Sequence, residues 1–193
     1  TNVPMKNEDS IAIKVLLPLV SIFLAFQSYK LVSSMHQFKI ESVPALLLIA
    51  WLINMFVTGV FALTGFVHPT QKLLPDVYYS IRNPELLTRV YNFLRVGLFR
   101  KFLLATIWKN RRKQKTYFNG KKSGFSNLAE QSRKAEFGHL IPFVILLLIS
   151  IYFLLIHLPM LGFFVLLWNL LGNLYPVILQ RHHRMRIQRI MNS

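Results

Sequence analysis

The sequence contains no cysteine. This absence excludes a disulfide scaffold, a zinc or iron–sulfur site with cysteine ligands, and nucleophilic catalysis by a thiol. Acidic residues are scarce too, since seven Asp and Glu face 23 Lys and Arg and give a formal net charge of +16. Charged residues are only 16% of the 193 residues and apolar residues are 53%, whereas soluble domains are about 25% charged. A chain this hydrophobic and this basic is typical of a membrane protein with cationic surfaces near lipid headgroups.

Several motifs of soluble enzymes are also missing. The sequence has no Gly-rich phosphate loop, no Walker pattern and no nucleophile-elbow serine, which argues against soluble nucleotide chemistry. The positive charge lies beside hydrophobic runs and no nucleic-acid-binding motif accompanies it, so we do not expect nucleic acid as a partner. Anionic lipid headgroups are the partner that this charge favours.

Four long apolar runs are each long enough to cross a bilayer as a helix, which takes about 20 residues. They cover residues 11–31, 43–67, 139–156 and 159–179. The first lacks a small-residue cleavage pattern and precedes a second span, so we interpret it as a retained helix rather than a signal peptide. The short link ending at Pro159 predicts a tight helical hairpin between the last two runs.

The predicted fold is therefore all-α, a single polytopic membrane domain over residues 1–193. We expect a two-helix unit at 1–67, a basic interfacial segment at 68–138, a helical hairpin at 139–180 and a basic tail at 181–193. The segment from His68 to Gly138 holds 15 Lys and Arg against four acids, and the tail has four Arg. The positive-inside rule puts both regions and the amino terminus in the cytoplasm of a bacterial inner membrane.

The basic segment itself shows helical patterns. Apolar residues recur at spacings of three and four from Pro84 to Phe102 with arginines between them, which predicts a basic amphipathic helix at the membrane interface. A charge run follows at Lys109–Lys115. A second helix is expected to start near Ser126 and to continue through Glu136 into the third span.

The fourth span carries a polar stripe. On a helix of about 100° per residue, one narrow face holds the following residues: Asn169, Gly172, Asn173, Pro176, Gln180, His183 and Arg184. Amides are costly against lipid, so this face should point at another helix or a cavity. It either joins two helices or holds a ligand with a polar or anionic head and an apolar tail.

Glu136 and His139 are three residues apart at the entry to the third span, so on a helix they share a face. A carboxylate beside an imidazole can hold its tautomer, as a histidine general base requires. The alternative is a plain surface pair. Because the Glu-x-x-His pattern occurs once and di-metal bundles need it twice with two further Glu, we predict no metal site.

At these two places the sequence resembles the glycosyl-4,4′-diaponeurosporenoate acyltransferases of bacterial carotenoid synthesis. The resemblance rests on Lys134-Ala135-Glu136-x-x-His139, then Asn173, then Gln180-Arg181-x-x-Arg184-x-Arg186, and it covers roughly residues 91–190. Those enzymes are integral membrane proteins that pass a fatty acyl group to a sugar hydroxyl of a glycosylated carotenoid.

The resemblance implies roles for individual residues. His139 would be the general base and Glu136 its orienter. Asn173 and Gln180, with Asn169 on the same stripe, would bind the sugar or the acyl carbonyl. Arg181, Arg184 and Arg186 would bind an anionic group of the donor, which is acyl-CoA or a similar thioester, and no tightly bound cofactor is expected.

The sequence is compatible with three functions. The leading one is a membrane acyltransferase that acts on a hydroxyl of a lipid or glycolipid, with a hydrophobic glycolipid or isoprenoid as substrate. The second is a non-catalytic membrane subunit whose basic segment docks a partner protein or anionic lipid. The third is another membrane-embedded transferase or reductase, such as a methyltransferase.

Overall fold

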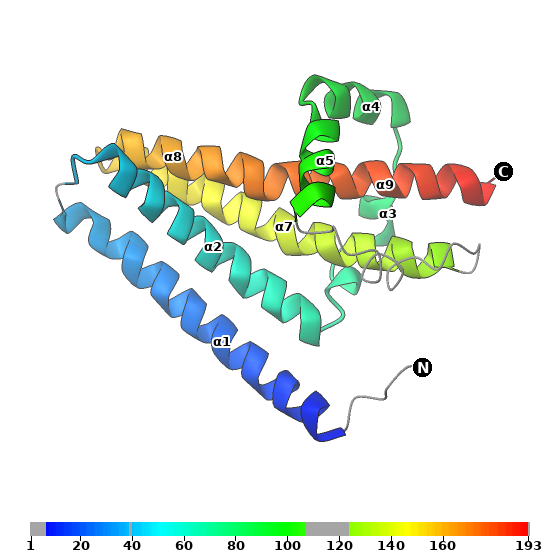
Figure 1. Cartoon of the computed structure of the whole chain (residues 1–193), viewed down its shortest axis with the longest axis horizontal. Coiled ribbons are helices and arrows are strands. Elements are labelled where there is room, and N and C mark those ends of the chain that lie inside the picture. Colours follow the sequence, from blue (N-terminus) through cyan, green and yellow to red (C-terminus); the bar gives the residue numbers. More distant parts are fainter. Residues whose placement is uncertain (1–6, 39, 107–123, 193) are drawn as a thin grey trace. The chain divides into compact units, whose positions relative to one another are not determined.

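The computed structural model describes residues 7–38, 40–106 and 124–192, and nearly all of them are helical (Figure 1). The α-helices are α1 (Asn7–Ser34), α2 (Val43–Val67), α3 (Asp76–Tyr79), α4 (Pro84–Phe93), α5 (Val96–Thr106), α7 (Gly124–Leu155), α8 (Pro159–Asn169) and α9 (Tyr175–Asn192). Short turns of tighter helix lie at η1 (Met35–Gln37) and η2 (Thr70–Lys72), and a π-helical turn, η3 (Leu170–Leu174), joins α8 to α9. The described ranges contain no β-strand.

Four stretches are long and apolar enough to span a membrane, which confirms the predicted all-α, polytopic fold. They are Ala12–Gln37, Val43–Val67, Gly124–Leu155 and Pro159–Met191. The last two are longer than their apolar cores. Helix α7 begins at Gly124, ahead of the hydrophobic run, and the fourth stretch continues through the π-helical turn into the arginine-rich α9.

The chain forms two compact units. Unit 1 contains Thr1–Pro69 and Gly138–Asn173, and unit 2 contains Thr70–Phe137 and Leu174–Ser193. The chain passes between them three times: between Pro69 and Thr70, inside α7 and inside η3.

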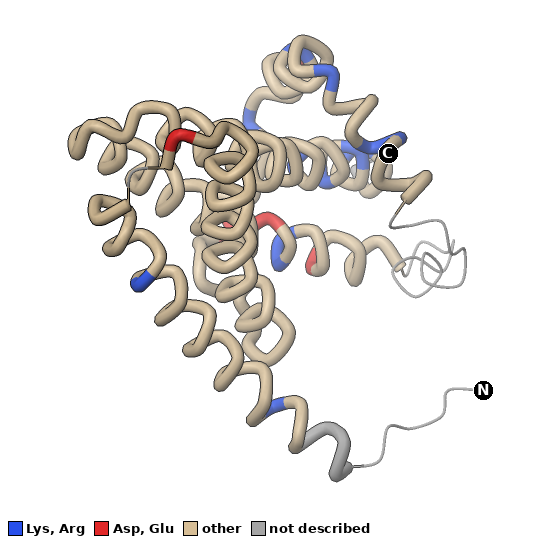
Figure 2. Tube along the Cα trace, turned by 60° about the vertical axis from the view of Figure 1, so that its left-hand side comes forward, with Lys and Arg blue, Asp and Glu red and all other residues tan. Residues whose placement is uncertain are grey.

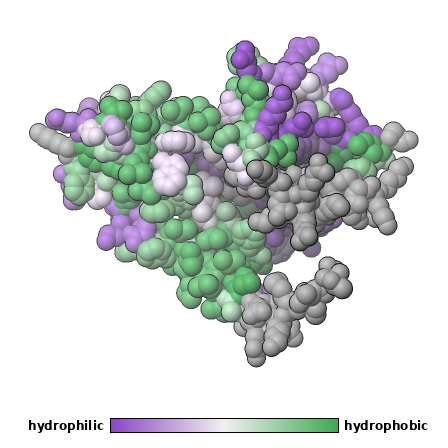
Figure 3. Space-filling view, viewed as in Figure 1, coloured by the Kyte–Doolittle hydropathy of each residue, from purple (hydrophilic) through white to green (hydrophobic). Residues whose placement is uncertain are grey.

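Unit 1 is a bundle of apolar helices, in which α1 packs along α2 and α2 packs against α8. Its buried core includes Ala50, Ile53, Leu146, Phe153 and Val165. Large apolar side chains on the outer faces of α1 and α2 are exposed, and Figure 3 shows this hydrophobic surface. Lipid, rather than water, is the solvent that such a surface favours.

The hairpin of unit 1 is held by a close approach of two backbones. Helix α7 ends at Leu155, and α8 starts at Pro159, a residue suited to the first helical position. A Cβ at Gly162 would lie 2.8 Å from the backbone oxygen of Ser150, so only glycine fits there. The Ser150 hydroxyl donates to the Gly162 carbonyl over 2.7 Å, which satisfies a polar group inside the membrane region.

Unit 2 carries most of the charge, as the blue positions in Figure 2 show. Its described residues include 12 Lys and Arg against four acids. Helices α4 and α5 pack against α9 around Tyr91, Val96, Ile178 and Leu179. Helix α4 starts at Pro84, where the Asn83 side chain accepts the Leu86 N–H over 2.9 Å.

The amphipathic helix predicted over 84–102 is broken in two at Leu94 and Arg95, and Arg95 has a φ of 50°. The break has a packing reason. Tyr91 and Val96 are five positions apart, so one straight helix would point them about 140° apart. The turn brings both into one core against α9. The predicted charge run Lys109–Lys115 lies outside the described residues.

Candidate active site

His139 lies in α7 and its ring contacts the amide of Asn173 in the π-helical turn. The distance from His139 Nδ1 to Asn173 Oδ1 is 3.1 Å. The same oxygen accepts the Thr58 hydroxyl from α2 over 3.2 Å, and Asn173 is 1% exposed. Thus α2, α7 and η3 of unit 1 converge on one buried amide.

This contact favours one tautomer of His139. A side-chain amide oxygen can only accept hydrogen bonds, so the hydrogen between the two groups belongs to Nδ1. A neutral imidazole with its hydrogen on Nδ1 has its lone pair on Nε2. The structure therefore presents His139 as an imidazole whose Nε2 can accept a proton.

The amide network continues along the fourth span. Asn173 Nδ2 donates to Asn169 Oδ1 over 3.1 Å, and Asn169 Nδ2 donates to the Phe143 carbonyl over 2.9 Å. Asn169 is fully buried. Because a buried polar group without a partner costs about 1–3 kcal/mol, a chain in which each amide supports the next holds Asn173 firmly in place.

The π-helical turn is what brings Asn173 to this position. A π-helical turn adds a residue within a helix and often occurs at functional sites. Here it lies between α8 and α9, so the predicted polar stripe is not one continuous face. Asn169 and Asn173 end in unit 1, whereas Gln180, His183 and Arg184 belong to unit 2.

A second polar cluster lies in unit 2 around Glu136, which is 0% exposed. Arg181 Nε and the Tyr78 hydroxyl each donate to Glu136 Oε1 over 2.9 Å, and Arg184 Nη2 donates to Oε2. Arg184 is 2% exposed and also donates from Nη1 to the Ser132 hydroxyl over 3.4 Å. One carboxylate thus binds two guanidinium groups, compensates their charge in part and orders α3, α7 and α9 around them.

Glu136 and His139, predicted to contact each other, take different partners. The contacts of Glu136 are Tyr78, Arg181 and Arg184, whereas the His139 ring contacts the Asn173 amide and the Gly172 backbone. The reason is electrostatic. A buried carboxylate needs a full opposite charge, and a guanidinium supplies it at any physiological pH, whereas a neutral imidazole does not.

Tyr78 and Tyr79, which lie beside Glu136, Arg181 and Arg184, keep their hydroxyl groups protonated. Burial raises the pKa of Tyr78, and the neighbouring Glu136 carboxylate raises it further. Burial also raises the pKa of Tyr79, again with a smaller contribution from Glu136. The centroid of the Tyr78 ring lies 4.8 Å from the Arg181 guanidinium, and that of the Tyr79 ring lies 5.2 Å from the Arg184 guanidinium. Both distances are within the range of a cation–π contact.

The structure also describes Gln180 and Arg186, the two other predicted binding residues. Gln180 takes part through its backbone, since its carbonyl accepts the Ser132 hydroxyl over 3.0 Å. Arg186 is exposed on α9, away from the carboxylate that binds Arg181 and Arg184.

Sequence analysis missed Thr58 and Tyr78. A lone threonine in an apolar span and a tyrosine in a polar link carry no local signal of a role. Only the tertiary contacts with Asn173 and Glu136 reveal them.

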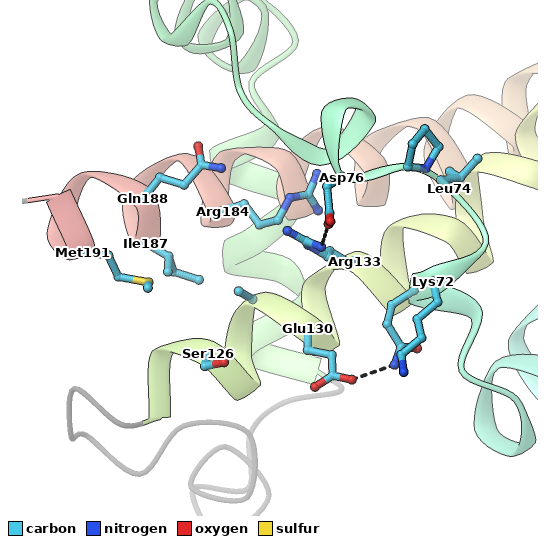
Figure 4. A pocket seen from close by; sticks show the side chains of 13 residues that line it. Lys72, Leu74, Asp76, Ser126, Glu130, Arg133, Arg184, Ile187, Gln188 and Met191 are labelled. Atoms are coloured by element: carbon cyan, nitrogen blue, oxygen red, sulfur yellow. Dashed lines mark hydrogen bonds and ion pairs between the residues drawn. The ribbon is translucent and has the colours of Figure 1, made fainter.

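Unit 2 also contains a cavity of about 740 Å³, shown in Figure 4. Its wall mixes charged side chains, among them Lys72, Arg133 and Arg184, with apolar ones such as Ile187 and Met191. Arg133 pairs there with Asp76. Across the described part of the chain, no three His, Asp or Glu side chains gather as metal ligands would.

Comparison with known proteins gives one match. The family model of the glycosyl-4,4′-diaponeurosporenoate acyltransferases matches residues 75–193, which is more than half of the chain. The match starts before the predicted resemblance and includes Glu136, His139 and Asn173, whereas α1 and α2 lie outside it. No curated protein and no solved structure matches the chain.

Proposed function

Since the chain belongs to the glycosyl-4,4′-diaponeurosporenoate acyltransferase family, we propose that it acylates a hydroxyl on the sugar of a membrane-borne carotenoid glycoside or similar glycolipid. The observation that carries this proposal is the His139–Asn173 contact within the matched region. It supplies the histidine that acyl transfer to a hydroxyl requires, in one tautomer. The donor is an acyl thioester such as acyl-CoA.

In the proposed reaction, His139 Nε2 removes the proton of the acceptor hydroxyl as its oxygen attacks the thioester carbonyl carbon. The carbon–sulfur bond then breaks and an ester forms. The imidazolium returns the proton to the departing thiolate. General-base catalysis of this kind contributes about 10²–10⁴-fold in rate.

Asn173 acts as the positioning residue of this base. Its amide oxygen accepts from both Thr58 and His139, and its amide nitrogen donates to Asn169. The Asn173 amide nitrogen, which would have to donate to an oxyanion, is therefore already bound to Asn169. The arrangement favours orientation of His139 over the substrate-binding role predicted for Asn173 and Asn169, much as an asparagine orients the histidine of papain-like enzymes.

Glu136 has a different proposed task from the one predicted for it. Its carboxylate fixes Arg181 and Arg184, so it organises unit 2 within the matched region. The predicted donor-binding role of these two arginines is weakened, because their charge is already compensated in part.

For membrane orientation we propose that the amino terminus, residues 68–138 and the tail from residue 181 share the cytoplasmic side. The excess of basic over acidic residues in these regions supports this orientation. The cytoplasmic side also supplies acyl thioesters.

The test is lipid mass spectrometry of bacteria that produce a carotenoid glycoside, express this chain and receive isotopically labelled fatty acid. We expect labelled glycolipid with the wild type and a loss of about 10²-fold or more with His139→Ala. Asn173→Ala should lose about tenfold or more, because the ring keeps its chemistry but not its orientation. His68→Ala, which changes an exposed histidine at the end of α2, is the matched control and should keep full activity.

Equal product from wild type and His139→Ala, with both proteins present in the membrane, would refute the mechanism. If neither the wild type nor the His139→Ala protein gives labelled product, the alternative of a non-catalytic subunit is favoured. That alternative predicts a stable complex that survives His139→Ala but is lost when the Lys109–Lys115 run is neutralised.

A further inference from the structure

Helix α9 carries basic residues on two faces, and among the described residues a carboxylate contacts only one of these faces. Arg181 and Arg184 lie three apart and bind Glu136. His182, Arg186 and Arg189 are spaced by four and three residues, so they share a second face. Among the residues described, Glu136 contacts only the first face.

Helix α5 adds a further cation to the second face. It packs against α9, and the charges that act on His182 are Arg186, Arg100 and Arg189, all of them positive. His183 is likewise influenced by His182, Arg100 and Arg186. The three arginines Arg100, Arg186 and Arg189, with the rings of His182 and His183 beside them, are named the α5–α9 cationic cluster below.

Two polar atoms of this cluster are buried without a hydrogen-bond partner among the described residues. They are Arg100 Nε and His182 Nδ1. The His182 ring is fixed because it stacks on Tyr91, with ring centroids 4.0 Å apart. An always-charged guanidinium N–H that is buried and unpaired is costly, and native proteins rarely leave one so.

Three of the four acids of unit 2 have partners elsewhere. Asp76 pairs with Arg133, Glu130 accepts from Gln71 over 2.6 Å, and Glu136 holds its two arginines. The fourth, Glu85, lies in the first turn of α4. The electrostatic neighbours of His182 include no carboxylate. Among the described residues no carboxylate contacts Arg100 or His182, so the α5–α9 cationic cluster has two donors that can bind an anion.

We propose that the α5–α9 cationic cluster binds a phosphate group, with Arg100 Nε and His182 Nδ1 as donors and Arg186 as the outer cation. Arginine forms short, charge-assisted bonds to phosphate oxygens, which accept several donors at once. The phosphate belongs either to the acyl donor, a reading that rests on the proposed function, or to an anionic lipid headgroup. Hydrophilic side chains gather over α4 and α9 on the face seen in Figure 3, so a charged ligand can reach this unit.

The test uses the purified full-length protein in a neutral detergent, without any acceptor. Calorimetry measures the Kd for coenzyme A in one arm. In a second arm, flotation measures binding to vesicles of phosphatidylglycerol, with pure phosphatidylcholine vesicles as the reference. The variants are Arg100→Gln, Arg186→Gln and His182→Phe, and the last of these keeps the stack on Tyr91 while removing the ring nitrogens.

We expect each arginine variant to weaken binding about tenfold or more, the factor typical of one lost charged hydrogen bond. Lys101→Gln is the matched control, because it removes one charge from an exposed side chain next to Arg100. It should change binding by less than about twofold. Loss in the coenzyme A arm assigns the phosphate to the donor, and loss in the vesicle arm assigns it to the lipid.

Two results would overturn the inference. One is wild-type binding in both arms for Arg100→Gln and Arg186→Gln. The other is an equal loss with Lys101→Gln, which would mean that net charge alone attracts the anion.

Arg186 is exposed, so Arg186→Gln tests the site without a risk to folding. Because the assay needs no turnover, an inactive His139→Ala protein should bind as the wild type does.

Discussion

The substitution Glu136→Gln tests the electrostatic core of unit 2. It keeps the shape of the side chain and removes the one negative charge that faces two guanidinium groups. The amide oxygen can still accept from Tyr78. The amide nitrogen, however, is a donor that must face another donor, so Arg184 loses the carboxylate that balances its charge and keeps only its contacts with Ser132 and Tyr79.

The expected cost is dominated by Arg184. Removing one partner of a buried ion pair costs about 3–5 kcal/mol, and Arg184 is 2% exposed opposite a carboxylate that is 0% exposed. Arg181 is 32% exposed, so water replaces much of what it loses and its share is at most about 1 kcal/mol. Since 1 kcal/mol lowers the midpoint of a chain of this size by about 2–4 °C, the Tm should fall by about 10 °C.

Thermal unfolding of the detergent-solubilised protein, followed by circular dichroism at one scan rate, measures this shift. Glu130→Gln is the control, because it removes an acid that is exposed and accepts a hydrogen bond from Gln71. In the double variant Glu136→Gln with Arg184→Met, no unpaired charge stays buried, so most of the lost stability should return. The reasoning fails if Glu136→Gln shifts the Tm by less than about 2 °C, or if the double variant is no more stable than the single one.

Three further predictions address other parts of the chain. Burial, with a smaller contribution from a neighbouring carboxylate, raises the pKa of Tyr78 above its ordinary value of 10.0. The unfolded chain therefore loses this proton first, so Tm should fall between about pH 9 and pH 11, and less so in Tyr78→Phe. Gly162→Ala should destabilise by about 1–3 kcal/mol, because the new Cβ would lie 2.8 Å from the Ser150 backbone oxygen, and an unchanged Tm would contradict this approach. Since the chain has no cysteine, single variants report topology without background. A membrane-impermeant maleimide should label Ser42→Cys in intact cells and Ser126→Cys only after lysis, and the reverse pattern would invert the proposed orientation.

The membrane fold was predictable because its signal is local. A window of about 20 apolar residues is enough to identify a span, and the four runs carry that signal whatever they pack against. The break at Arg95 was not predictable in the same way. The spacing of apolar residues fits one helix across it, and only the shared core of Tyr91 and Val96 against α9 requires two.

The candidate site was predictable in part. Helical spacing identified Glu136, His139, Asn169 and Asn173 as polar groups in unfavourable surroundings, and the structure gives each of them polar partners. Spacing also put Glu136 and His139 on one face, but it could not rank their partners. The choice depends on arginines 45 and 48 positions away from Glu136.

Competition for Glu136, the one buried carboxylate in the part of the chain that the structure describes, explains the arrangement that results. Two guanidinium groups are permanently charged, so they attract Glu136 more strongly than a neutral ring can. His139 is left with an amide, and an amide that accepts from Nδ1 sets the tautomer without adding a charge. A base positioned in this way depends on geometry, and the geometry depends on the buried chain from Asn173 to Asn169. The π-helical turn between α8 and α9 is therefore a part of the catalytic machinery that we propose, although none of its leucines carries any chemistry.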